Sequence, residues 1–171
     1  GDFIFVNKFT YGLRLPVVNR EVVALGEPRR GDVVVFRLPS DPSTNYIKRL
    51  VGLLGDHIVV REKRVYVNGE EMPVRLDGMF EPFASTPLAQ IGVETLGPVD
   101  HRVLYIGERP SYDFDSVVPD GHLFFMGDNR DNSRDSRFPE VGCVRIDCLL
   151  GKAGRMWLNW RGPHGPTRNR I

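Results

Sequence analysis

The sequence predicts a mostly β fold, and three observations favour it. The 171 residues include 18 glycines and 13 prolines, which is typical of short strands joined by tight turns and too many for a helical bundle. The apolar residues gather in short runs such as VVVFRL (residues 33–38), bounded by turn residues. No long amphipathic helical period occurs in the sequence.

Five apolar runs predict strands in the first half of the chain. The last two are expected to pair across Glu62-Lys63, and Asn68-Gly69 is expected to make the next turn. These runs are residues 2–9, 33–38, 46–56, 57–60 and 64–67.

The second half begins with a weakly patterned segment. Residues 70 to about 100 contain several prolines and little periodicity, so we expect an insertion or a long excursion there. Strand character resumes at HRVLYI (residues 101–106), and the turn signal Pro119-Asp120-Gly121 leads into HLFFM (122–126). LLGKAGRMWLNW (149–160) predicts a long final strand.

Charge and hydropathy exclude several classes of protein. The 23 basic and 22 acidic side chains leave a net charge of +1, which argues against nucleic-acid binding through bulk charge. The composition, 41% hydrophobic and 26% charged, is that of a folded chain rather than a disordered one. No apolar stretch is long enough for a membrane span, and no signal-peptide pattern occurs.

Neither a metal site nor a bound cofactor is predicted. The four histidines occur singly, without the spacing of metal ligands or of a Ser-His-Asp triad, and no phosphate-binding glycine loop is present. Cys143 and Cys148 are too few for a disulfide scaffold. A single bridge across the short VRID segment and two separate buried thiols are both compatible with their spacing.

Two polar stretches are candidates for chemistry. Residues 127–137, GDNRDNSRDSR, follow the apolar HLFFM run, so they form either a solvated loop or an ordered lattice of ion pairs at a strand end. In the second stretch, Lys48 and Arg49 are adjacent in an apolar strand and must face opposite sides of the sheet. Lys48 either protects a strand edge or lies in apolar surroundings, where a lowered pKa lets a neutral amine act as a general base.

Four blocks of sequence closely resemble bacterial type I signal peptidases, which are membrane-anchored proteases with a Ser/Lys dyad. The blocks are GDFIFVNKFTYG, RRGDVVVF, YIKRLVGLLGD and MGDNRDNSRDSR, at residues 1–12, 29–36, 46–56 and 126–137. The resemblance implies coiled antiparallel sheets that form a barrel-like catalytic core, with a small inserted β/loop subdomain. It implies that residues 1–62 and 119–171 form this protease core of an extracytoplasmic catalytic domain, and that residues 63–118 are the variable insert.

The resemblance also implies roles for individual residues. Lys48 matches the general base, and Ser133 matches the loop serine that hydrogen-bonds and orients it. The backbone around Tyr46 and Ile47 matches the strand that pairs with an extended substrate. Two pairs of charged residues match those that support the family's active site: Arg49 with Asp128, and Asp135 with Arg137.

One catalytic group has no match in these 171 residues. The family's nucleophilic serine lies in a Ser-x-Met-x-Pro-Thr type segment shortly before the strand that corresponds to GDFI. We therefore expect this chain, without that serine, the upstream segment and the membrane anchor, to be inactive as a peptidase.

The implied function is removal of signal peptides from exported pre-proteins, with cleavage after small residues in an Ala-x-Ala-like pattern. The alternatives are a specialised Ser/Lys maturation protease of the same fold and a non-catalytic relative that binds peptides by strand addition. No cofactor is implied. The implied location is the outer, periplasmic side of a bacterial plasma membrane, where signal peptides, the membrane surface and the protein translocation machinery would be the partners. Five aromatic residues form either ordinary core or a lipid-facing surface: Phe3, Phe5, Phe9, Trp157 and Trp160.

Overall fold

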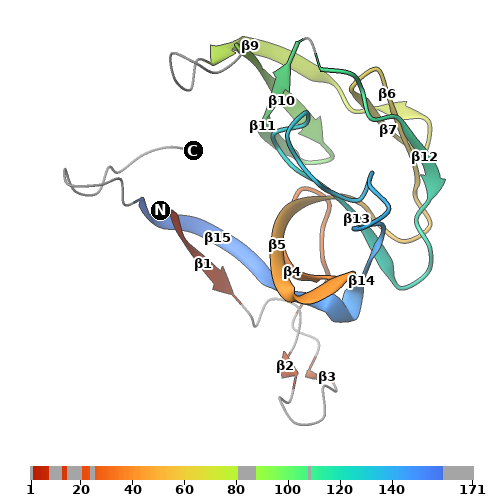
Figure 1. Ribbon diagram of the computed structural model, residues 1–171. Coiled ribbons are helices and arrows are strands. Elements are labelled where there is room, and N and C mark those ends of the chain that lie inside the picture. Colours follow the sequence, from red (N-terminus) through yellow and green to blue (C-terminus); the bar gives the residue numbers. More distant parts are fainter. Residues whose placement is uncertain are drawn as a thin grey trace.

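The computed structural model describes residues 2–7, 13–14, 21–23, 26–80, 88–107 and 109–159, and this part of the chain consists almost entirely of β-strands (Figure 1). Its one short helix there is a 3-10 turn, Ile146–Cys148. The strand pairings are antiparallel, apart from one isolated parallel bridge between Leu104 and Asn129. The prediction of a mostly β fold is confirmed.

The largest sheet of the described residues has six strands. It contains Lys48 and Arg49, and the polar loop of residues 127–137 follows one of its strands. Its order is β1-β15-β4-β5-β13-β14, so within the described residues it is an open sheet with β1 and β14 at its edges. β1 and β15 run side by side as a long ribbon, and β5 curves strongly (Figure 1). In chain order the strands are β1 (Asp2–Asn7), β4 (Val33–Leu38), β5 (Asp41–Gly52), β13 (His122–Met126), β14 (Val144–Arg145) and β15 (Leu149–Asn159).

The predicted hairpin of residues 57–67 is present in a second sheet, of order β12-β6-β7-β8. Glu62 and Lys63 have φ angles of 49° and 66°, and Asn68 and Gly69 have φ angles of 54° and 84°. Positive φ at both central residues matches the twist of a two-residue hairpin turn. The strands are β6 (His57–Arg61), β7 (Arg64–Val67), β8 (Glu70–Glu71) and β12 (Phe114–Val117).

Residues 70–100, for which the sequence predicts an insertion or a long excursion, contain regular strands. The segment forms most of a three-stranded sheet of β9 (Val74–Phe80), β10 (Ala89–Leu96) and β11 (Val99–Ile106), in the order β11-β10-β9. The buried positions of β10 include Gly92 and Glu94. Neither is apolar, so the inward face of this strand lacked the hydrophobic alternation by which a half-buried strand is recognised.

Two apolar clusters make up the core. One packs β4, β5, β13 and β15 of the large sheet around Phe36, Leu50 and Phe125, all fully buried. The other packs the end of β5 and β13 against the four-stranded sheet, with Phe124 and Ile58 at its centre. Adjacent residues of β13 therefore pack into different clusters. This packing holds β13 in position, and with it the start of the polar loop that follows.

Three smaller expectations concern cysteines, membrane spans and aromatic residues. Cys143 and Cys148 are not joined by a disulfide. Among the described residues, no helix has the length and hydropathy needed to cross a bilayer. The five aromatic residues considered for a lipid-facing surface lie outside the part of the chain whose side chains are described.

The described residues also contain a small two-stranded sheet of β2 (Leu13–Arg14) and β3 (Glu21–Val23).

Candidate active site

Lys48 projects from the middle of β5 toward the loop that follows β13. Its Nζ donates a hydrogen bond to Ser133 Oγ at 2.7 Å. Two residues earlier on the same face of the strand, the ring of Tyr46 lies 5.3 Å from Nζ. The structure thus brings together the lysine and the loop serine that sequence analysis singled out.

The surroundings of Lys48 make its amine easier to deprotonate. Partial burial lowers the pKa of Lys48, because water is removed from the charged ammonium form. The positive charge of Arg137 lowers the pKa further, whereas the carboxylates of Asp135 and Asp128 oppose these effects. The net shift is downward, so a larger fraction of Lys48 is neutral at a given pH than for a lysine in water.

Arg49 faces the other side of β5 and meets Asp128. Its Nε and Nη2 donate to the two carboxylate oxygens of Asp128 at 2.8 and 2.7 Å, a bidentate pair. Its Nη1 donates to the carbonyl of Gly31 at 2.8 Å. The two adjacent cations therefore have different environments, as the alternation of a strand requires.

Asp135 holds the polar loop together from inside. Its carboxylate is fully buried and accepts hydrogen bonds from Arg137 Nε and Nη2, at 2.8 and 2.9 Å, and from the backbone N–H of Gly127 at 2.9 Å. Arg137 Nη2 also donates to the carbonyl of Arg130 at 2.7 Å. Of the two alternatives for residues 127–137, the structure has the ordered lattice of ion pairs.

Gly127 is required by close packing that the sequence analysis did not identify. A Cβ at this position would lie 2.1 Å from Ser133 Oγ, 2.4 Å from Ser133 Cβ and 3.6 Å from Lys48 Nζ. Any side chain would therefore displace the serine from the lysine. Only the bare backbone of glycine lets the start of the loop pass directly beneath Ser133.

Three further ionisable residues lie near the site and were not singled out as site residues from the sequence. Glu94, His101 and Arg130 are 0%, 7% and 2% exposed, and they lie where β10 and β11 contact the loop. Arg130 belongs to the polar run noticed in the sequence. Glu94 gave no such signal, because it is a single acidic residue in a weakly patterned segment, and His101 is a single histidine at the start of a predicted strand.

Tyr46 and Ile47 lie at a partly unpaired edge of β5. One side of the strand pairs with β4 from Asp41 to Arg49. On the other side, pairing with β13 covers Arg49, Leu50 and Gly52, and no strand among the described residues pairs there with Asp41–Lys48. Ile47 is 40% exposed. Backbone groups beside Lys48 are thus available on this side for an added strand, as far as the described residues show.

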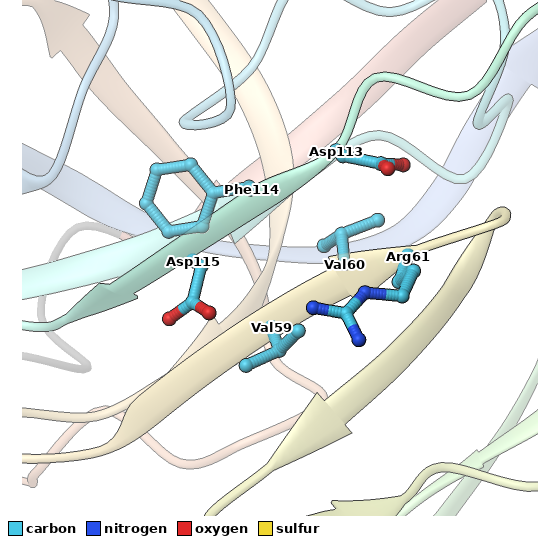
Figure 2. A pocket seen from close by; sticks show the side chains of 6 residues that line it. All are labelled: Val59, Val60, Arg61, Asp113, Phe114 and Asp115. Atoms are coloured by element: carbon cyan, nitrogen blue, oxygen red, sulfur yellow. The ribbon is translucent and has the colours of Figure 1, made fainter.

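Two open hollows of the described residues lie elsewhere. One, of about 220 Å³, is lined by residues of β6 and β12, and Figure 2 shows its lining side chains, among them Arg61, Asp113 and Asp115. A second, of about 310 Å³, lies between β12 and the loop at Phe138. Neither is lined by Lys48 or Ser133. The candidate site lies along the partly unpaired edge of β5 instead. No group of three or more potential metal ligands occurs in the described part of the chain.

Comparison with known proteins identifies the family. The model of the family described as signal peptidase, peptidase S26, matches residues 1–158. The chain belongs to this family. It is similar to a signal peptidase I of Pseudomonas fluorescens, with 46% identity over 100% of this chain and 64% of the relative. A signal peptidase I of Pseudomonas aeruginosa is 47% identical over 95% of this chain and 61% of its own length.

The chain spans less than two thirds of the length of these two signal peptidases. A crystal structure of a signal peptidase I from Enterococcus faecalis V583 is also similar, with a TM-score of 0.45 and 23% identity over 74% of this chain and 96% of that one. Membership of the signal peptidase family confirms the resemblance drawn from the four sequence blocks, two of which carry Lys48 and Ser133.

Proposed function

We propose that the intact protein is a serine endopeptidase that removes signal peptides from exported pre-proteins, with Lys48 as its general base. One observation carries the proposal: a lysine with a lowered pKa donates a 2.7 Å hydrogen bond to Ser133, in a chain of the signal peptidase family. A neutral amine held in a fixed direction can take a proton from a hydroxyl at moderate pH.

Lys48 acts as a base twice in the proposed reaction. The amine takes the proton of a serine hydroxyl as its Oγ bonds to the substrate carbonyl carbon, and the proton then passes to the leaving amine as the C–N bond breaks. Lys48 next takes a proton from a water molecule whose oxygen bonds to the acyl carbon, and Lys48 returns this proton to the serine Oγ as the acyl C–O bond breaks. Ser133 orients Nζ, while Arg49, Asp128, Asp135 and Arg137 keep strand and loop together.

We assign the nucleophile to a serine outside these 171 residues. Among the described residues, the only hydroxyl hydrogen-bonded to Lys48 is that of Ser133. None of the other described serines is a hydrogen-bond partner of Lys48; they are Ser40, Ser43, Ser111, Ser116 and Ser136. As the family resemblance implies, the chain without that serine is proposed to be inactive.

The substrate is proposed to add as an extended strand along the open edge of β5. The backbone of Tyr46 and Ile47 would pair with the residues before the cleaved bond, and shallow contacts beside Lys48 would favour small side chains in an Ala-x-Ala-like pattern. This placement brings the scissile carbonyl next to Lys48, because Lys48 directly follows the two pairing residues on the same strand.

The surroundings of the reaction follow from the proposed function. The protease core of residues 1–62 and 119–171, with its insert of residues 63–118, would act on the periplasmic side of a bacterial plasma membrane. Its partners would be signal peptides, the membrane surface and the protein translocation machinery. No cofactor is needed, since the general base and the nucleophile are both side chains.

Cleavage of a purified pre-protein by the full-length protein in detergent micelles tests the proposal. We expect a single cut after an Ala-x-Ala segment, and no cut by Lys48→Ala with an unchanged circular dichroism spectrum. Cleavage by Lys48→Ala at the wild-type rate would refute the general base. Cleavage of a different protein but no signal peptide would favour the maturation protease. Signal-peptide binding without any cleavage would favour the strand-addition relative.

A further inference from the structure

A buried ion pair joins the three-stranded sheet to the catalytic loop. Glu94 on β10 is fully buried, and Arg130 in the loop is 2% exposed. Arg130 Nη1 donates to Glu94 Oε1 at 2.7 Å and Nη2 donates to Oε2, so the pair is bidentate. A buried pair of this kind is costly to desolvate and adds little stability compared with apolar packing, but it fixes geometry. It therefore fixes where the loop sits on the sheet.

His101 lies between this pair and the support of the active site. It is the cross-strand neighbour of Glu94 on β11. Its Nε2 is 3.3 Å from Glu94 Oε2 and 3.8 Å from Asp128 Oδ1. Neither ring nitrogen makes a regular hydrogen bond within the described residues. Burial, with a further contribution from Arg49, lowers the pKa of His101 to about 4, so the ring is neutral at physiological pH.

The backbone reinforces the same connection. The N–H of Leu104 on β11 donates to the carbonyl of Asp128 at 2.8 Å, and the N–H of Arg130 donates to the carbonyl of Leu104 at 3.0 Å. Residues 128–130 are thus tied to β11 by backbone bonds and to β10 and β11 by side chains. Their position is set by the sheet of the insert as well as by the protease core.

This segment is connected to both members of the Lys48–Ser133 pair through neighbouring residues. On one side Asp128 holds Arg49, the residue next to Lys48. On the other side Gly127, the residue before Asp128, lies directly beneath Ser133. A shift of residues 128–130 would move Arg49 and Gly127, and would thereby change the distance and direction between Lys48 Nζ and Ser133 Oγ.

We propose that Glu94 and His101 are positioning residues of the active site, through which the sheet of β10 and β11 sets the geometry of Lys48 and Ser133. The assignment rests on the proposed function for its kinetic consequences. The expected effect on the environment of Lys48 does not depend on whether the protein cleaves signal peptides.

The test uses three variants of the full-length protein. His101→Phe keeps a ring of similar volume but removes both nitrogens. Glu94→Gln combined with Arg130→Gln keeps a hydrogen-bonding pair and avoids an unpaired buried charge. Arg102→Gln is the matched control, because Arg102 is adjacent to His101 on β11 but points outward and is 63% exposed. If His101→Phe does not give a cooperative thermal unfolding transition, His101→Gln replaces it.

Two measurements separate a positioning role from a purely structural one. The first is kcat and KM for pre-protein cleavage. The second is the pKa of Lys48, followed by NMR through its ¹³C-labelled ε-methylene group, which needs no activity. We expect kcat to fall about 2- to 30-fold in the first two variants with KM nearly unchanged. The pKa of Lys48 should move up toward that of an exposed lysine, because burial is what lowers it.

The outcomes are distinguishable. An unchanged Lys48 pKa in both His101→Phe and the Glu94/Arg130 double variant would overturn the inference, even if their melting temperatures fall. An equal change in Arg102→Gln would overturn it too. If the variants raise the pKa of Lys48 but the wild-type protein cleaves no pre-protein, the positioning role is supported and the proposed function is refuted.

Discussion

The Nζ of Lys48 and the Oγ of Ser133 lie 2.7 Å apart although 85 residues separate them in the chain. Pairing of β5 with β13 brings them together, because Arg49 is paired with Met126 where the loop begins. The loop then turns back over β5, held by the carboxylates of Asp128 and Asp135. The contact is thus a product of sheet register and of buried charge.

Lys48→Arg should abolish peptidase activity in the full-length protein. A guanidinium remains charged at any working pH, so it cannot accept the proton of a hydroxyl. The rate should fall by at least about 10²- to 10⁴-fold, the usual contribution of a general base. Initial rates of pre-protein cleavage measure this loss, and retention of more than a tenth of the wild-type rate would exclude Lys48 as the base.

Ser133→Ala should lower the rate less than substitution of Lys48. The variant loses the oxygen that accepts the hydrogen bond from Nζ, but Lys48 stays on its strand beside Tyr46. Misorientation of a catalytic group costs up to about 10²-fold. Comparison of kcat for Ser133→Ala, Ser133→Thr and wild type checks this, since threonine keeps the hydroxyl. An Ser133→Ala variant as inactive as Lys48→Ala would instead favour Ser133 as the nucleophile.

Gly127→Ala should disable the site while the fold remains. The new Cβ would overlap Ser133 Oγ at 2.1 Å, and the loop must shift to relieve the overlap. Gly107→Ala is the matched control, because a Cβ there meets nothing within 4 Å. We expect a loss of about 10²-fold or more in kcat for Gly127→Ala and no change for Gly107→Ala. Similar activities of the two variants would contradict the close packing.

The sequence carried the information for the strands whose inward faces are apolar. The Val and Phe residues of β4 and the two turns around β7 were predicted correctly, because side-chain alternation and turn residues are local signals. β10 was missed because Gly92 and Glu94 occupy its buried face. A buried carboxylate is recognised only through its partner, and Arg130 lies 36 residues away.

The candidate site was predictable to the extent that its residues fall in two distinctive segments. Lys48, Arg49 and the polar loop could be identified by strand alternation and by family resemblance. The need for glycine at position 127 depends on a contact with Ser133, six residues later, that exists only once the loop has folded over β5. Long-range contacts of this kind leave no local pattern in a single sequence.

Activity should rise with pH and level off below the pH at which an ordinary lysine titrates. Only neutral Lys48 can act as the base, and burial lowers its pKa below the reference value of 10.5. The rising limb of kcat/KM against pH reports this pKa for the free enzyme. A limb centred at or above 10.5 would show that the ammonium form is not disfavoured in solution.

The same pKa shift makes a prediction for stability. Between the folded pKa and 10.5, the unfolded state binds more protons than the folded state, so stability rises with pH across that window. Lys48→Met removes this dependence. Its melting temperature should therefore exceed that of wild type at neutral pH, and the difference should shrink as the pH approaches 10.5. A melting-temperature difference between Lys48→Met and wild type that does not change with pH would contradict burial of the Lys48 amine.

His101 should make the protein sensitive to mild acid. Its pKa is about 4 in the folded state against a reference value of 6.5, so between these values the unfolded state takes up a proton that the folded state does not. Stability therefore falls as the pH drops through this window, by at most about 1.4 kcal/mol per pH unit. Urea unfolding from pH 7 to 4 should show a shallower loss for His101→Gln than for wild type, whereas Arg102→Gln should follow wild type. Parallel curves for wild type and His101→Gln would mean that burial does not hold the imidazole neutral.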